Sequence, residues 1–97
     1  MNGALRELMA YRISQADESL EAAELLFNTG KYRSSVNRAY YAMFYAVLAL
    51  LVCGDHSISK HAGVISLFDR EFVKTGIVDK TFSRWLHEAF ELRQRTD

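Results

Sequence analysis

The pattern of apolar and polar positions divides the chain into four helical segments separated by glycines. Gly30, Gly54 and Gly76 each follow a stretch with apolar residues at helical spacing, where helices commonly end in a left-handed cap. The chain contains no proline, the commonest helix breaker. Because short connections favour antiparallel neighbours, the pattern predicts an all-α protein: an up-down-up-down antiparallel four-helix bundle, with room for one extra short helix.

The second segment is apolar on every side. Fifteen consecutive residues, 39–53, are apolar or aromatic, in a helix expected to begin near 32–35 and to end at Cys53. A helix that is hydrophobic all round must be surrounded, so this segment is predicted to be the central helix of the bundle. A membrane-spanning helix needs about 20 apolar residues. The shorter run, and an N-terminus without an apolar signal region, therefore favour a cytoplasmic protein with no membrane partner.

The other three segments are amphipathic. The third is expected to be capped by Ser57 or Ser59 and the fourth by Asp79. The first carries an apolar stripe of Met9, Ile13, Ala16, Leu20, Ala23 and Phe27, and an acidic face with Asp17, Glu18, Glu21 and Glu24. Residues expected to point inward are His61, Val64, Ile65, Phe68 and Phe72 in the third, and Phe82, Trp85, Leu86, Ala89, Phe90 and Leu92 in the fourth.

Composition and motifs exclude several classes of function but do not identify one. Twelve basic and twelve acidic residues cancel, so a nucleic-acid contact would need a local patch. Cys53 is the single cysteine, which excludes an internal disulfide and fits a reducing compartment. A glycine-rich phosphate loop, a nucleophile elbow, a zinc pattern and paired histidines at metal spacing are all absent, so no metal and no cofactor is predicted. The 97 residues, 1–97, form one domain, and the charged helical pattern at 91–97 is what truncation at the C-terminus would give.

Antiparallel pairing predicts where polar side chains gather. If the third and fourth helices mirror each other about Gly76, His61 lies level with residues 91–95. The fourth helix would then run parallel to the second and end beside residues 50–53. This register gathers His61, Arg93, Arg95 and Asp97 at one end of the bundle. It places Arg38 at the other end, opposite Glu21 and Glu24.

Each candidate also has a structural interpretation. Arg38 is more often an ion pair than a ligand clamp, and His61 is as often a helix cap or core-edge residue as a functional one. Arg93, Arg95 and Asp97 are by default a solvated helix end. Since so small a bundle cannot cover every side of its central helix, part of that helix is expected to form a homodimer interface. The candidates for core or dimer interface are Tyr40, Phe44, Tyr45 and Leu48.

Two stretches, Ser34-Ser35-Val36-Asn37-Arg38-Ala39-Tyr40-Tyr41-Ala42-Met43-Phe44 and Lys60-His61-Ala62-Gly63-Val64, resemble a known family. They are similar to the small HEPN-domain proteins of prokaryotes, in the subgroup with Arg-Ala-Tyr-Tyr-Ala-x-Phe on the second helix. The Gly-Lys-Tyr turn at 30–32, the segment 72–76 and the Arg-x-x-x-Asp ending at Asp97 also fit. The resemblance covers nearly the whole chain.

The resemblance implies a helical bundle that dimerises through its long helices. Many such proteins act with a minimal nucleotidyltransferase as a toxin and antitoxin pair. Active members are metal-independent ribonucleases, in which an Arg and a following His of both subunits meet across the dimer. The resemblance thus suggests Arg93 and Asp97 as catalytic candidates, and the predicted register adds His61. The candidates for nucleotide or RNA binding are Arg38, Tyr41, Lys60 and Arg95.

The sequence departs from the ribonuclease pattern at one position. Arg93 and Arg95 stand where the catalytic Arg would be, but no His follows within the 97 residues, and Asp97 is the fourth residue after Arg93. The resembled subgroup commonly has Asp-Tyr there. Three hypotheses therefore remain: a dimeric binding module with a nucleotidyltransferase partner, a ribonuclease toxin in which His61 substitutes for the missing His, and a purely structural bundle.

Overall fold

A computed structural model of the chain describes residues 2–54 and 61–96, and the regular structure of these residues is entirely helical. The elements in order are α1 (Gly3–Asn28), α2 (Tyr32–Cys53), α3 (His61–Phe68), a π-helical turn η1 (Asp69–Val73) and α4 (Lys80–Thr96). The predicted all-α fold is confirmed, as is the extent of the second helix. The turn η1 continues α3 directly, and its wider hydrogen bond joins Lys74 N to Asp69 O at 2.8 Å.

Most of the predicted helix ends are confirmed. Gly30 and Gly76 have positive φ angles of 80° and 81°, as a left-handed cap requires. Gly54 follows the last residue of its helix as predicted, but it does not form a left-handed cap. Its φ is −86°, and its N–H donates to Leu50 O at 3.0 Å as in a regular helix. The Asp79 carboxylate accepts from Thr81 N at 2.7 Å, and this hydrogen bond lowers the pKa of Asp79. The predicted caps Ser57 and Ser59 lie outside the described residues.

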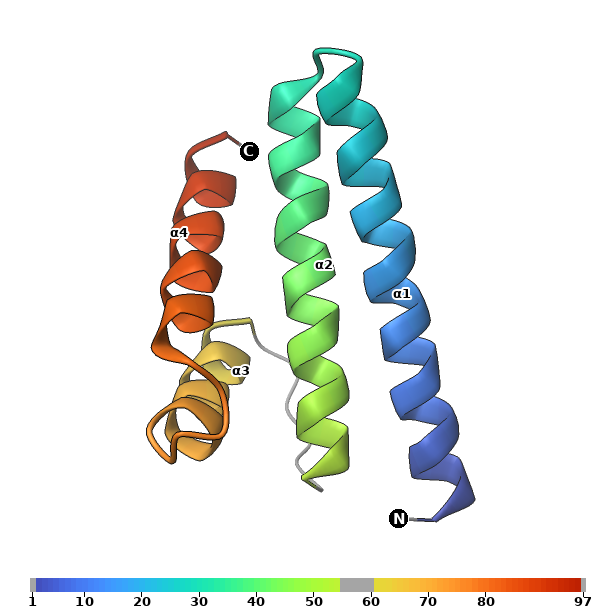
Figure 1. Cartoon of the computed structure of the whole chain (residues 1–97), viewed down its shortest axis with the longest axis vertical. Coiled ribbons are helices and arrows are strands. Elements are labelled where there is room, and N and C mark those ends of the chain that lie inside the picture. The colour runs from blue at the N-terminus through green and yellow to red at the C-terminus, as the bar shows by residue number, and fades with distance from the viewer. Residues whose placement is uncertain (1, 55–60, 97) are drawn as a thin grey trace.

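The helix α2 is central, with α1 on one side and α3 and α4 on the other (Figure 1). Within the described part of the chain, α1 packs against α2 and against no other element. Only 33% of the most apolar stretch of α2 is buried. The described chain therefore does not surround α2, as expected for a bundle too small to cover every side of its central helix.

The core lies between α2 and the C-terminal helices. Four α2 residues spaced by four, three and four, which share one helix face, are buried against α3 and α4. Both Phe68 of α3 and Leu86 of α4 are 0% exposed. The core consists of Tyr40, Phe44, Val47, Leu51, Val64, Ile65, Phe68, Leu86 and Ala89.

Small residues form the contact between α1 and α2. The Ser35 hydroxyl donates to the Ala23 carbonyl oxygen at 2.7 Å, and Ser19 and Ala49 are also buried. The larger residues of the predicted α1 stripe are not covered, since Ile13 and Leu20 are 47% and 49% exposed. Without a third helix beside α1, only the small residues of its stripe are enclosed. Three more residues that were expected to point inward are also exposed: Phe27 in α1, and Trp85 and Leu92 in α4.

The predicted direction of the fourth helix is wrong. The last turns of α4 lie beside the first half of α2, because the Phe90 and Tyr40 rings have centroids 5.8 Å apart (Figure 1). Thus α4 runs antiparallel to α2 and does not end beside residues 50–53. The predicted pairing of the third and fourth helices about Gly76 assumed a full-length third helix. In the structure α3 is short and continues directly into η1.

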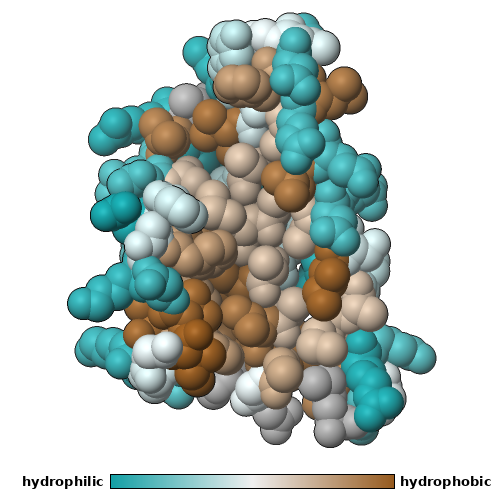
Figure 2. Space-filling view, viewed as in Figure 1, coloured by the Kyte–Doolittle hydropathy of each residue, from teal (hydrophilic) through white to brown (hydrophobic). Residues whose placement is uncertain are grey.

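Apolar residues continue onto the surface over α2. Figure 2 shows tan and brown residues along the middle of one face, with teal, hydrophilic residues at both sides. By length and composition α2 passes the test for a membrane-spanning helix, a test that the core helix of a soluble protein also passes. Its buried core residues and its packing against three helical neighbours are those of a core helix.

Candidate functional site

Two arginines from different helices meet at one tyrosine. The guanidinium carbon of Arg38 lies 4.9 Å from the centroid of the Tyr41 ring, and that of Arg93 lies 5.1 Å from the same centroid. Arg93 also lies 5.5 Å from the centroid of Tyr40. We call Arg38, Tyr40, Tyr41 and Arg93 the arginine–tyrosine site. All three distances are within the range of a cation–π interaction.

Local helix geometry and the direction of α4 build this site. Arg38 and Tyr41 are three residues apart, so they share a face of α2. Arg93 reaches them because α4 runs antiparallel to α2. The Arg38 guanidinium is also fixed by Asn37, whose Oδ1 accepts from Nε at 3.3 Å and from Nη2 at 2.9 Å.

Tyr40 contributes no negative charge to the site. Burial of Tyr40 raises the pKa of its phenol to about 12, against the opposing effect of Arg93. Tyr40 is therefore neutral at physiological pH and does not cancel a guanidinium charge. The predicted ion pair of Arg38 is wrong, since neither Glu21 nor Glu24 pairs with it in the described structure. Two cations on an aromatic surface can bind phosphate groups and stack on planar rings.

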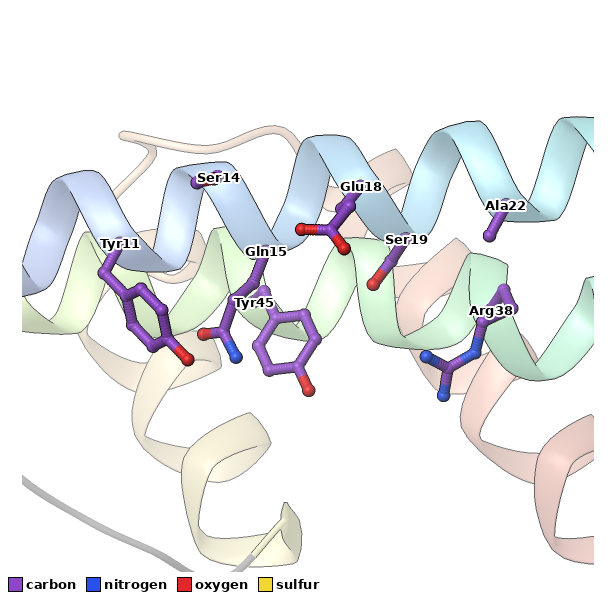
Figure 3. A pocket seen from close by; sticks show the side chains of 8 residues that line it. All are labelled: Tyr11, Ser14, Gln15, Glu18, Ser19, Ala22, Arg38 and Tyr45. Carbon is purple, nitrogen blue, oxygen red and sulfur yellow. The ribbon is translucent and has the colours of Figure 1, made fainter.

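A groove between α1 and α2 adjoins this site. It has a volume of about 320 Å³ and includes Arg38, so it is continuous with the arginine–tyrosine site. Figure 3 shows Tyr11, Gln15 and Tyr45 next to one another along this groove, with Ser19 and Arg38 further along it. The α1–α2 groove is lined by Tyr11, Ser14, Gln15, Glu18, Ser19, Ala22, Arg38 and Tyr45.

The structure brings together some of the predicted site residues and separates others. Arg38 and Arg93 were expected at opposite ends of the molecule but share one site, because α4 runs the other way. Arg95 is exposed in the last turn of α4. Tyr40 and Phe44 belong to the core, and Tyr45 and Leu48 are half-buried. Lys60, the side chain of His61, and Asp97 lie outside the described residues.

Some polar residues of interest were missed in the sequence. His87, for which no partner was evident, has its Nε2 2.7 Å from Asp69 Oδ2. Ser83 Oγ donates to the other oxygen of the same carboxylate at 2.6 Å. Ser83 and His87 are one helical turn apart, and this spacing could have indicated that their side chains share a partner. Tyr11 and Gln15, which line the groove, have the same spacing on α1 and were also missed. Across residues 2–54 and 61–96 no three His, Cys, Asp or Glu side chains gather as metal ligands would.

Comparison with known proteins places these features in a family. The profile of the HEPN domain matches residues 9–97. A "UPF0332 protein" from Thermotoga maritima is 44% identical over 94% of this chain and 69% of its own length. The "Putative toxin MJ0605" of Methanocaldococcus jannaschii is 38% identical over all of this chain and 72% of its own length.

A second archaeal relative extends the comparison. The "Putative toxin MJ0142" of the same organism is 42% identical over 88% of this chain. This chain spans 58% of that relative, so each of the three relatives contains sequence without a counterpart here. No solved structure matches. The domain profile and the three relatives agree with the helical fold, and the chain belongs to the HEPN family.

Proposed function

We propose that this chain is the RNA-binding HEPN module of a toxin–antitoxin pair. The observation that carries the proposal is the convergence of Arg38 and Arg93 on the Tyr41 ring. Guanidinium groups bind phosphate oxygens through paired N–H donors, and their flat faces stack on bases. The toxin names of two relatives support the assignment to such a pair, and the resemblance to HEPN proteins supports a minimal nucleotidyltransferase as the partner.

The proposed module acts as a homodimer. A second groove of about 330 Å³ lies between α1 and α2 and is almost entirely apolar, with one carboxylate at Asp17. Ile13 and Leu50 provide its largest side chains, and Ala46 and Ala49 let a second helix approach closely. We call this surface, formed by Met9, Ile13, Ala16, Ala46, Ala49, Leu50 and Cys53, the apolar groove. A second copy of the chain placed here would cover apolar surface that the single chain leaves open.

RNA binding is tested with substitutions in the arginine–tyrosine site. We expect Arg38→Ala and Arg93→Ala each to weaken binding of a fluorescent single-stranded RNA by about tenfold or more, since a charged hydrogen bond contributes about 1.5 to 3 kcal/mol. Each substitution should also reduce the slope of log affinity against log salt by about 0.7. The measurement is fluorescence anisotropy at several salt concentrations.

Two controls make this experiment decisive. Arg84→Ala removes an exposed arginine from the same helix, α4, and is expected to leave affinity nearly unchanged. Arg38→Lys keeps the charge but loses the paired donors, so it should retain the salt slope and lose part of the affinity. If Arg84→Ala weakens binding as much as Arg93→Ala does, the site has no special role and the proposal fails.

Cleavage is measured on the same RNA. In the ribonuclease alternative, Arg93 holds the scissile phosphate, and His61 acts as the general base or acid. Under this alternative the parent protein cleaves RNA without a metal, and His61→Ala abolishes cleavage while binding persists. Cleavage by His61→Ala at the parent rate, or no cleavage by the parent, would exclude a catalytic role for His61.

A further inference from the structure

The α1–α2 groove adjoins the arginine–tyrosine site and continues it toward α1. We infer that this groove holds the single-stranded continuation of the bound RNA, with bases stacked on Tyr11 and Tyr45. The inference rests on the proposed RNA binding but concerns a different set of residues. It assigns a binding surface to α1 and fixes the strandedness of the ligand.

The two sites share a continuous series of aromatic and cationic groups. Tyr45 follows Tyr41 by one helical turn, and their ring centroids are 5.8 Å apart with 35° between the ring planes. Arg38 lies on Tyr41 and also lines the groove. A chain that leaves Arg93 therefore meets Tyr41 and Arg38 next, and then the tyrosines of the groove. Such alternation of aromatic rings and positive charges is typical of surfaces that bind single strands.

The far end of the groove offers a second aromatic ring. Tyr11 is 59% exposed, although its ring is large and apolar. Arg12 lies 5.9 Å from the Tyr11 centroid and donates through Nη1 to Gln15 Oε1 at 2.9 Å. This bond leaves the Gln15 amide N–H groups to donate elsewhere, as recognition of a base edge requires. Tyr11, Gln15 and Tyr45 lie next to one another in Figure 3.

Arginines lie along the groove and at both of its ends. The groove lining contributes one arginine, Arg38, and one carboxylate, Glu18, while Arg12 lies at the Tyr11 end and Arg93 at the Tyr41 end. The guanidinium groups are therefore spaced along the path proposed for the strand. Attraction of phosphate groups to such a patch does not depend on base sequence.

Base stacking requires single-stranded RNA. In a duplex the bases are paired and stacked on one another, so their faces cannot reach Tyr11 or Tyr45. The groove also stays accessible in the proposed dimer. Tyr41 and Leu50 are nine residues apart, which places them on opposite sides of a helix with 3.6 residues per turn. A copy bound at the apolar groove therefore leaves the tyrosine side of α2 uncovered.

The test compares single-stranded and duplex RNA on tyrosine variants of the whole chain. The probe is a fluorescein-labelled twelve-nucleotide RNA of mixed sequence, alone or annealed to its complement. Tyr11→Ala and Tyr45→Ala should each weaken single-strand binding by about 5- to 150-fold, the range for loss of one base–aromatic stack. Tyr11→Phe should retain nearly full affinity, because it retains the ring. The parent should bind the duplex more weakly than the single strand.

Two further variants serve as controls. Tyr32→Ala removes an equally exposed tyrosine, 60% accessible, from the start of α2 outside the groove, and should leave affinity unchanged. Glu18→Gln should strengthen binding, since it removes the one carboxylate from the groove lining. Circular dichroism and thermal melting establish that each variant is folded before its affinity is compared.

The outcomes separate this inference from the proposed function. If Arg38→Ala and Arg93→Ala weaken binding while Tyr11→Ala and Tyr45→Ala do not, RNA binding stands and the groove has no part in it. Equal affinity for duplex and single strand overturns the inference in the same way. If the tyrosine variants lose a protein partner but keep RNA affinity, the groove is a protein-docking surface and the inference is wrong. If no variant changes RNA affinity, the proposed function fails as well.

Discussion

Tyr40 belongs both to the hydrophobic core and to the arginine–tyrosine site. Its side chain is 0% exposed in the core and stacked on Phe44 at a centroid distance of 5.7 Å, while the Arg93 guanidinium lies 5.5 Å from the centroid of the same ring. Burial raises the pKa of the phenol more than the positive charge of Arg93 lowers it, so this pKa rises from 10.0 to about 12. The residue thus anchors the arginine–tyrosine site to the core and remains uncharged while it does so.

This raised pKa makes the stability of the protein depend on pH in alkali. The unfolded chain loses the Tyr40 proton near pH 10.0, whereas the folded chain retains it to about pH 12. The contribution to stability is complete below pH 10 and is lost as the pH rises through this window, by about 2 kcal/mol at pH 12. We expect urea unfolding to show this loss for the parent relative to Tyr40→Phe, which has no phenol to titrate. An equal response of the two proteins between pH 9 and 12 would contradict the expectation.

At the scale of elements, α2 organises the fold through two different contacts. Toward α3 and α4 it presents large side chains, whereas toward α1 it presents small ones such as Ser35 and Ala49. The sides between these contacts carry the arginine–tyrosine site and the apolar groove. One helix therefore contributes to the core, the proposed RNA site and the proposed dimer interface, and Tyr40 is shared by the first two.

A charge on the core face of α2 should prevent folding. Phe44 is 5% exposed and surrounded by aromatic rings, so Phe44→Asp buries an unpaired carboxylate at a cost of several kcal/mol. We expect this variant to be insoluble, or unfolded by circular dichroism. Leu48→Asp, one turn further along α2 and only half-buried, should be better tolerated. Recovery of folded, soluble Phe44→Asp would mean that the core is not where the structure places it.

The sequence allowed prediction of the elements but not of their arrangement. Helix limits depend on local features such as the Gly30 turn and the Asp79 cap, and these were predictable. The direction of α4 depends on the length of α3 and on the π-turn at Asp69, which no local pattern revealed. That direction decides whether Arg93 lies near Cys53 or near Arg38. Arg38, Tyr41 and Arg93 could therefore be named as candidates from the sequence, but which of them lie together could not.

At the scale of the whole molecule, the apolar groove is the surface that the proposed dimer would cover. Ile13 is 47% exposed in the single chain, so a charge there should be compatible with folding. We expect Ile13→Asp to be a folded monomer by light scattering, where the parent is a dimer. Leu25→Asp, at a more exposed α1 position outside the groove, should remain dimeric. A dimeric Ile13→Asp, or a monomeric parent, would exclude the apolar groove as the dimer interface.

The attachment of α1 to α2 alone has a consequence for how the molecule opens. Since no other described element holds α1, its detachment does not require the core between α2, α3 and α4 to come apart. Detachment would remove Tyr11 from one groove and Ile13 from the other in a single event. If the proposed RNA binding and dimerisation hold, a local opening of the first helix would disable both together, while most of the hydrophobic core stays folded.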